Sequence, residues 1–190
     1  MTLRLSNWLV VSTANSNTMK SIIILITIHL LGLTAFAQTP EEALAKNGIT
    51  LPVLPSAIGN YTSVVKSGNL LYLSGRGSLQ QDGTYTTGKL GKELNVQQGY
   101  AAARLCAIAQ IAVLKAWLGN LSKVKRIIKV TGFVNSTDAF TDQPKVINGF
   151  SDLIVSVFGE KGIHARSAVG VAALPGGWPV EVEMIVEVEE

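Results

Sequence analysis

Arginine and carboxylate side chains stand close together in the last part of this chain. Arg166 lies in one strand-like run, and Glu181, Glu183, Glu187 and Glu189 lie in the next run, interspersed with apolar residues. A guanidinium group can offer two parallel N–H donors to an anion, and a carboxyl group can accept or donate a proton during a reaction. Such residue types suit the binding of a small anion and acid–base chemistry on it, if the fold brings them together.

The alternation in the last run predicts a strand with one apolar and one acidic face. Carboxylates two residues apart on one face repel each other unless they are solvated or countered. The basic run over residues 123–129 could supply the counter-charge. A solvated acidic face is the alternative for Glu183, Glu187 and Glu189.

The residue types argue against metal and nucleophilic catalysis. Beyond residue 37 the chain contains a single histidine, His164, and a single cysteine, Cys106. These cannot form a cluster of imidazole and thiolate ligands for zinc or copper, so we predict no metal and no other cofactor. A Ser–His or Cys–His pair would need His164 as its base, but beside Arg166 we expect His164 to make a structural hydrogen bond. Cys106 is predicted to be a buried apolar residue.

The N-terminal residues have the three parts of a secretory signal. Met19 and Lys20 precede an apolar run from Ile22 to Leu33, and Ala35-Phe36-Ala37 is a small-x-small cleavage site. The run is shorter than the about 20 residues that span a bilayer, which argues against the alternative, a stop-transfer anchor. We therefore expect residues 1–37 to be a signal peptide, with residues 1–18 preceding the true start. The mature protein would be periplasmic or secreted and free of the membrane.

Removal of 37 of the 190 residues leaves 153, a length typical of one domain with one core. Residues 38–190 are therefore predicted to form a single domain. They keep 14 of the 16 basic and all 13 acidic side chains, a formal charge of +1. Because nucleic-acid affinity rests on positive charge that neutralises phosphates, no nucleic-acid partner is expected.

Two long apolar segments are predicted to be helices. One runs from Val96 to Leu118 after Asn95 as N-cap, and the other runs from Pro144 to Phe158. Strand-like patterns occupy residues 61–66, 70–74, 126–134, 166–173 and 180–189, and residues 38–46 are interpreted as a polar lead-in. The order β-β-α-β-α-β-β predicts an α+β domain whose two helices cover one face of a mostly antiparallel or mixed sheet.

Short motifs in order along the chain resemble the RidA/YjgF family. They are Ala57-Ile58-Gly59-Asn60-Tyr61, Leu73-Ser74-Gly75, Gly132-Phe133-Val134, Asn148, Ala165-Arg166-Ser167, Leu174-Pro175 and Val180-Glu181-Val182-Glu183. The chain departs from the family pattern at Asn60, where proline is usual, and at Ala168, which replaces a cysteine common in its deaminases. A divergent subgroup is further suggested by three other motifs: Gly88-Lys89-Leu90-Gly91, Gly99-Tyr100-Ala101-Ala102-Ala103-Arg104 and Val146-Ile147-Asn148-Gly149. The predicted signal peptide suggests that this subgroup is exported.

The resemblance implies a homotrimer of chorismate-mutase-like fold that hydrolyses reactive imines or enamines to a keto acid and ammonia. Arg166 would then bind the carboxylate of a small metabolite through its planar fork. Glu181 would position the attacking water or carry the proton. The other substrate-binding groups would be Tyr61, Asn148, Gly75 and Ala168, the glycine and the alanine through backbone atoms.

The last two predicted strands are separated by a short loop, which suggests that they pair as a hairpin. If the loop spans Pro175 to Trp178, Arg166 faces about Glu187 and Glu181 faces about Ala172. At about 3.3 Å per residue, Arg166 and Glu181 would then lie about 20 Å apart within one chain. A site that uses both side chains is therefore predicted to form between adjacent subunits, unless the two strands do not pair.

Two other functions stay open beside an imine deaminase. The same residues could form a noncatalytic site that captures a small carboxylate. An endoribonuclease, an activity attributed to some relatives, is disfavoured by the near-neutral charge and by the lack of a second catalytic histidine.

Overall fold

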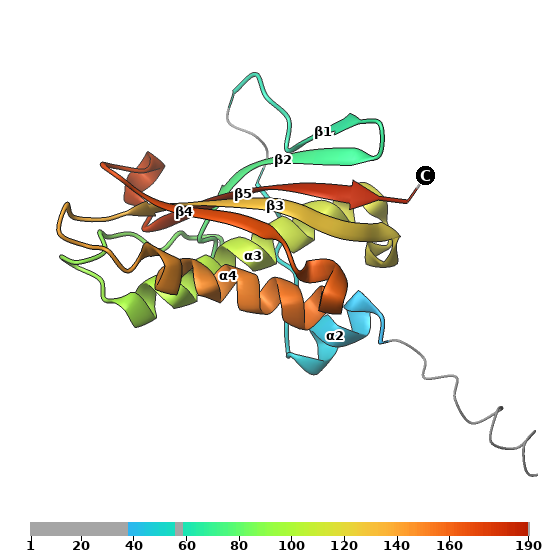
Figure 1. The fold of residues 1–190 in the computed structure, drawn as a ribbon, viewed down its shortest axis with the longest axis horizontal. Coiled ribbons are helices and arrows are strands. Elements are labelled where there is room, and N and C mark those ends of the chain that lie inside the picture. Colours follow the sequence, from blue (N-terminus) through green and yellow to red (C-terminus); the bar gives the residue numbers. More distant parts are fainter. Residues whose placement is uncertain (1–37, 56–58, 190) are drawn as a thin grey trace, which may run out of the picture. The chain divides into compact units, whose positions relative to one another are not determined.

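A computed structural model describes residues 38–55 and 59–189 (Figure 1). The predicted signal peptide and the first two residues of the Ala57–Tyr61 motif lie outside the described residues. Residues from Gln38 onward form one compact unit. This unit consists of a sheet with helices on one side (Figure 1).

The sheet has five strands in the order β1-β2-β5-β3-β4. The strands are β1 (Val64–Ser67), β2 (Leu70–Gly77), β3 (Val124–Asn135), β4 (Ala165–Val171) and β5 (Val180–Val188). β4 runs parallel to β3, and the other neighbouring pairs are antiparallel. The predicted α+β class, the mixed sheet and the order of its elements are confirmed.

The predicted hairpin of the last two strands is wrong. β5 lies between β2 and β3, and β4 lies at the sheet edge beside β3. β5 suits the centre because its alternate residues from Val180 to Val188 are all buried. The connection from β3 to β4 contains a helix, which gives the chain the length that a parallel pairing requires.

The two predicted helices are α3 (Val96–Leu118) and α4 (Gln143–Phe158), which pack against each other on one face of the sheet (Figure 1). Glycine allows a close approach: a Cβ on Gly149 of α4 would lie 2.0 Å from the carbonyl oxygen of Tyr100 in α3. A further helix, α2 (Pro40–Lys46), begins in the segment interpreted as a polar lead-in. The sequence feature that could have predicted α2 is the capping box that Thr39 and Glu42 form at its N-terminus. Short 3-10 turns follow at Leu121–Lys123, Gly159–Gly162 and Pro175–Gly177.

α3 forms the centre of the core. Its N-terminus is capped by reciprocal hydrogen bonds between Asn95 and Gln98, as the Asn95 prediction required. Among the described residues, α3 is the helix that is long and apolar enough to cross a membrane, but most of that apolar window is buried inside the fold. Cys106, in the middle of α3, is fully buried as predicted, and burial raises the pKa of its thiol. These features identify α3 as a core helix.

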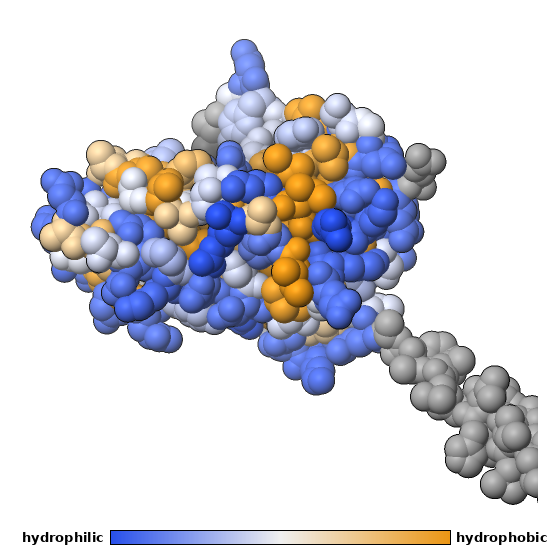
Figure 2. Space-filling view, viewed as in Figure 1, coloured by the Kyte–Doolittle hydropathy of each residue, from blue (hydrophilic) through white to orange (hydrophobic). Residues whose placement is uncertain are grey.

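No helix formed by the described residues lies over the opposite face of the sheet (Figure 1). Exposed large apolar side chains include Val65 of β1, Tyr72 of β2 and Val169 of β4. Figure 2 shows apolar surface between hydrophilic regions on one side of the molecule. We call the helix-free side of the sheet the open face.

Candidate functional site

Arg166 lies on the helix-covered side of the edge strand β4. It pairs with Val130 of β3, a buried residue that faces the helices. Its Nη1 donates hydrogen bonds to Asn148 Oδ1 at 2.9 Å and to Ser151 Oγ at 3.0 Å, both on α4. Two of the predicted site residues, Arg166 and Asn148, are thus brought together, and Ala168 follows two residues later on the same side of β4.

Ser151 was missed by the sequence reasoning, although it stands three residues after Asn148. That spacing places both side chains on one face of a helix. Ser151 therefore presents a second neutral acceptor to the guanidinium, and the pair holds Arg166 in one orientation.

His164 makes the structural hydrogen bonds expected of it. Its Nδ1 lies 2.6 Å from the Gly162 carbonyl oxygen and its Nε2 lies 3.1 Å from Ser151 Oγ. Since a carbonyl only accepts, Nδ1 carries the proton and Nε2 accepts from the Ser151 hydroxyl. Burial, and secondarily the charge of Arg166, lowers the pKa of His164. A neutral His164 thus orients Ser151, whose oxygen remains free to accept from Arg166.

Glu181 lies on the open face of β5. It pairs with Gly77 of β2 and with Phe133 of β3. Its carboxyl group sits over Gly75, because a Cβ on Gly75 would lie 2.1 Å from Glu181 Oε1. Burial, and secondarily the charge of Glu183, raises the pKa of Glu181. Gly75 is needed here because any larger residue would displace the carboxyl group.

A bulge in β2 creates the space for Glu181. The register with β5 shifts between Leu73 and Arg76, so one extra residue stands in β2. Gln110, fully buried in α3, holds this bulge by donating from Nε2 to the carbonyl oxygens of Ser74 at 2.9 Å and Val182 at 2.7 Å. A polar residue inside the apolar α3 pattern was the available signal for this role.

Tyr61 belongs to the segment that leads into β1. The hydroxyl of Ser74 donates to the carbonyl oxygen of Thr62 at 2.7 Å, which ties this segment to the β2 bulge. The Tyr61 side chain is 55% exposed and so is available to a ligand or to another subunit. This bond places the segment that contains Tyr61 beside the β2 bulge, where Gly75 lies under Glu181.

The predicted site residues fall into two groups that do not meet within one chain. Arg166, Asn148 and Ala168 form one group, and Gly75 and Glu181, with the Tyr61 segment, form the other. The register places Arg166 level with Met184, three residues along β5 from Glu181 and two strands away. The two Cα atoms are thus about 14 Å apart, and the side chains project from opposite faces. The separation of about 20 Å between Arg166 and Glu181 that a hairpin predicts is therefore wrong, and the observed register gives about 14 Å.

An aromatic pair stands beside Glu181. The rings of Tyr85 and Trp178 stack with centroids 4.6 Å apart. A Cβ on Gly77 would lie 2.4 Å from the Trp178 ring. Since Gly77 pairs with Glu181, the Trp178 ring covers the position in β2 that is paired with Glu181.

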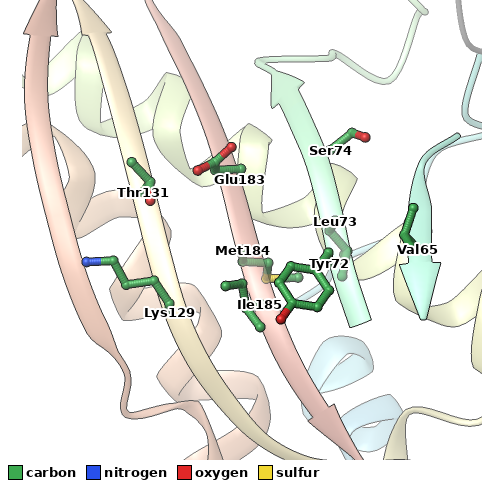
Figure 3. A pocket seen from close by; sticks show the side chains of 9 residues that line it. All are labelled: Val65, Tyr72, Leu73, Ser74, Lys129, Thr131, Glu183, Met184 and Ile185. Atoms are coloured by element: carbon green, nitrogen blue, oxygen red, sulfur yellow. The ribbon is translucent and has the colours of Figure 1, made fainter. Parts of the chain in front are cut away.

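A cavity of about 240 Å³ opens on the open face between β2, β5 and β3. Figure 3 shows Tyr72 of β2 and Glu183 of β5 at this cavity, while the Lys129 side chain extends from β3 toward β4. Lys129 Nζ donates to Ser167 Oγ at 2.8 Å.

The predicted counter-charge is confirmed at Glu187, which pairs with Lys125 at 2.6 Å.

No group of three or more His, Cys, Asp and Glu side chains that could hold a metal ion occurs within residues 38–55 and 59–189. The chemistry available to the two groups is that of a guanidinium, a buried carboxyl group and neutral hydrogen-bonding side chains.

Comparison of the sequence with known proteins shows which family the chain resembles. Residues 41–182 match the family described as "YjgF/chorismate mutase-like, putative endoribonuclease". Protein TCP17 of Trypanosoma cruzi is 50% identical over 76% of this chain and 91% of its own length. A 2-iminobutanoate/2-iminopropanoate deaminase of Dermatophagoides farinae is 32% identical over 76% of this chain and 98% of its own.

A solved structure agrees with these relatives. The protein Atu1372 of Agrobacterium tumefaciens, of unknown function, is 45% identical with a TM-score of 0.74, over 79% of this chain and 92% of its own. The fold, the order of the motifs and these similarities lead to one conclusion: the chain belongs to the YjgF/RidA family.

Proposed function

We propose that this protein is a deaminase that hydrolyses a small carboxylate-bearing imine or enamine to a keto acid and ammonia. The observation that carries the proposal is the set of partners of the Arg166 guanidinium. Its guanidinium is held by two neutral side chains, and within the described residues it forms no ion pair with a carboxylate. Its charge is therefore available to an anionic ligand, for which a guanidinium fork is well suited.

Glu181 supplies the second half of the proposed site. A carboxyl group whose pKa is raised by burial can both accept and donate a proton closer to neutral pH than an ordinary glutamate can. It would take a proton from water as the water oxygen attacks the imine carbon. It would return that proton to the nitrogen, which gives a carbinolamine. It would then carry the proton of the new hydroxyl group to the same nitrogen, and the carbon–nitrogen bond would break to release the keto acid and ammonia.

The site would form between subunits, because Arg166 and Glu181 project from opposite faces of one chain. A homotrimer would bring β4 of one protomer, with Arg166 and Asn148, against the open face of the next, with Glu181 and Gly75. An unpaired edge strand and a sheet face without a helix both favour association with another copy. The edge position of β4 and the exposed Val169 support this arrangement.

The test is ammonia release from 2-iminopropanoate generated in situ by an amino-acid oxidase. We expect the wild-type protein to accelerate the release and Arg166→Ala to reduce it to the rate without protein. Arg126→Ala removes an exposed arginine from β3 and should retain the wild-type rate. Equal rates for wild type and Arg166→Ala would refute the deaminase. Carboxylate binding without ammonia release would point to the noncatalytic binding protein instead.

A further inference from the structure

Arg76 lies in a second pocket, away from Arg166. It follows Gly75 in the β2 bulge and pairs with Val182, whose side chain faces the helices. Its side chain therefore lies on the side of the sheet opposite to Glu181. There it lines a pocket of about 230 Å³ between α3 and the segment that precedes β1. β2 and β4 are separated by two other strands, so this pocket is distinct from the surroundings of Arg166.

The guanidinium of Arg76 has an incomplete set of partners. Its Nη2 donates to Ser63 Oγ, while its Nε is buried and has no hydrogen-bond partner. No carboxylate in the described part of the chain forms an ion pair with it. Buried donors without a partner are rare in folded proteins. The bond to Ser63 therefore leaves donor capacity in the guanidinium of Arg76, which lines the pocket and is open there to an acceptor from outside the chain.

The other walls of the pocket are apolar. Leu54 and Pro55 line one side, and Val113 and Trp117 of α3 line the other. Trp117 is 50% exposed, although it is a large apolar side chain. A strongly hydrated inorganic anion would lose water here and would gain few donors in return. An anion with an apolar body would instead bury that body against the tryptophan.

We propose that this pocket binds a small organic carboxylate, with the carboxylate on Arg76 and an aliphatic or aromatic body against Trp117. The pocket is below the size of most drug-sized ligand sites, which suits a molecule of one ring or a short branched chain. The site is separate from the proposed deaminase site, and it stands whether or not the protein releases ammonia.

The experiment uses benzoate and inorganic phosphate as probes and follows the indole N–H signal of Trp117 by NMR. Loss of the signal in Trp117→Phe assigns it. We expect benzoate to shift this signal saturably, and phosphate not to compete with it at equal concentration. Arg76→Gln should weaken benzoate binding by about tenfold or more, because it removes the charge and the fork. Arg166→Ala should leave the titration unchanged.

A second variant covers the case in which Arg76→Gln disturbs the bulge. Ala116 is exposed on α3 and lines the same pocket. Ala116→Leu should fill the pocket, keep the helix and abolish the benzoate shift, while Arg76 remains in place. An unshifted Trp117 signal, equal competition by phosphate, retained binding in Ala116→Leu or loss of binding in Arg166→Ala would each overturn the proposal.

Discussion

Two side chains, Arg166 and Glu181, have surroundings that differ from those of an ordinary surface residue. Arg166 is oriented by neutral acceptors and forms no ion pair within residues 38–55 and 59–189. Glu181 is half-buried over a glycine, and this burial raises its pKa. The surroundings of Glu181 do not favour stability while its carboxyl group is ionised, because burial removes solvation from the charge. Such features are typical of functional sites.

The first prediction concerns the cost of Glu181 to folding. Its pKa in the folded state lies above the ordinary value of 4.5. The protonated carboxyl is therefore favoured by folding, so this group supports stability below that ordinary value and ceases to do so as pH rises through the folded pKa. Glu181→Gln should raise the melting temperature at pH 7, and the difference from wild type should shrink toward pH 4 in thermal unfolding followed by circular dichroism.

Glu187→Gln is the matched control, since Glu187 shares β5 but pairs with Lys125 at 2.6 Å. That variant should gain no stability at pH 7. A Glu181→Gln protein no more stable than wild type at pH 7 would contradict the burial argument.

The composition of the candidate site was readable from the sequence, but its geometry was not. Arg166 and Asn148 do meet, as the motifs implied, and Gly75 does lie under Glu181. The faces on which they lie depended on strand pairing, which local patterns do not determine. Ser151 and Gln110 escaped notice because a single polar residue in a helix has many structural uses.

At the scale of elements, the sheet order shows why local patterns alone were insufficient. The long helices and the strands were predicted close to their observed bounds, because each has a clear period or cap. The short Leu174–Pro179 loop suggested a hairpin, since strands adjacent in sequence often pair. β5 instead took the centre with its buried valines, and β4, with small residues such as Ser167 and Gly170, took the edge.

The crossing of α3 and α4 gives the second prediction. A Cβ at Gly149 would meet the backbone of Tyr100, which cannot rotate away as a side chain can. Gly149→Ala should lower the free energy of unfolding by about 3 kcal/mol, the upper range for overpacking. Chemical denaturation measures the change.

Ser156→Ala, an exposed change on α4 that loses one side-chain hydrogen bond, is the control. It should cost about 1 kcal/mol or less. Similar losses for the two variants would show that the helices do not cross as closely as described.

At the scale of the whole molecule, the arrangement of the two residue groups would make assembly a requirement of the proposed function. One chain carries Arg166 on one side of its sheet and Glu181 on the other. If the proposed site forms between neighbours in a closed ring, each protomer contributes to two sites. Activity then depends on which chains are adjacent, and not on the integrity of any single chain.

Subunit mixing gives the third prediction. Arg166→Ala and Glu181→Gln proteins should each be inactive, while trimers reassembled from equal amounts should regain about one quarter of the wild-type sites, since each site needs one intact residue from each neighbour. Ammonia release after joint refolding measures this. Separate refolding followed by mixing is the control, and no recovery after joint refolding would place both residues in one chain's site.

The burial of α3 bears on how the protein is synthesised. Before the fold closes, this segment exposes a window with mean hydropathy of 1.5, close to the length that partitions into a bilayer. The two strands β3 and β5, which lie inside the sheet, follow it in the chain. Until both strands have been synthesised, the nascent polypeptide exposes an apolar segment that the folded protein largely buries.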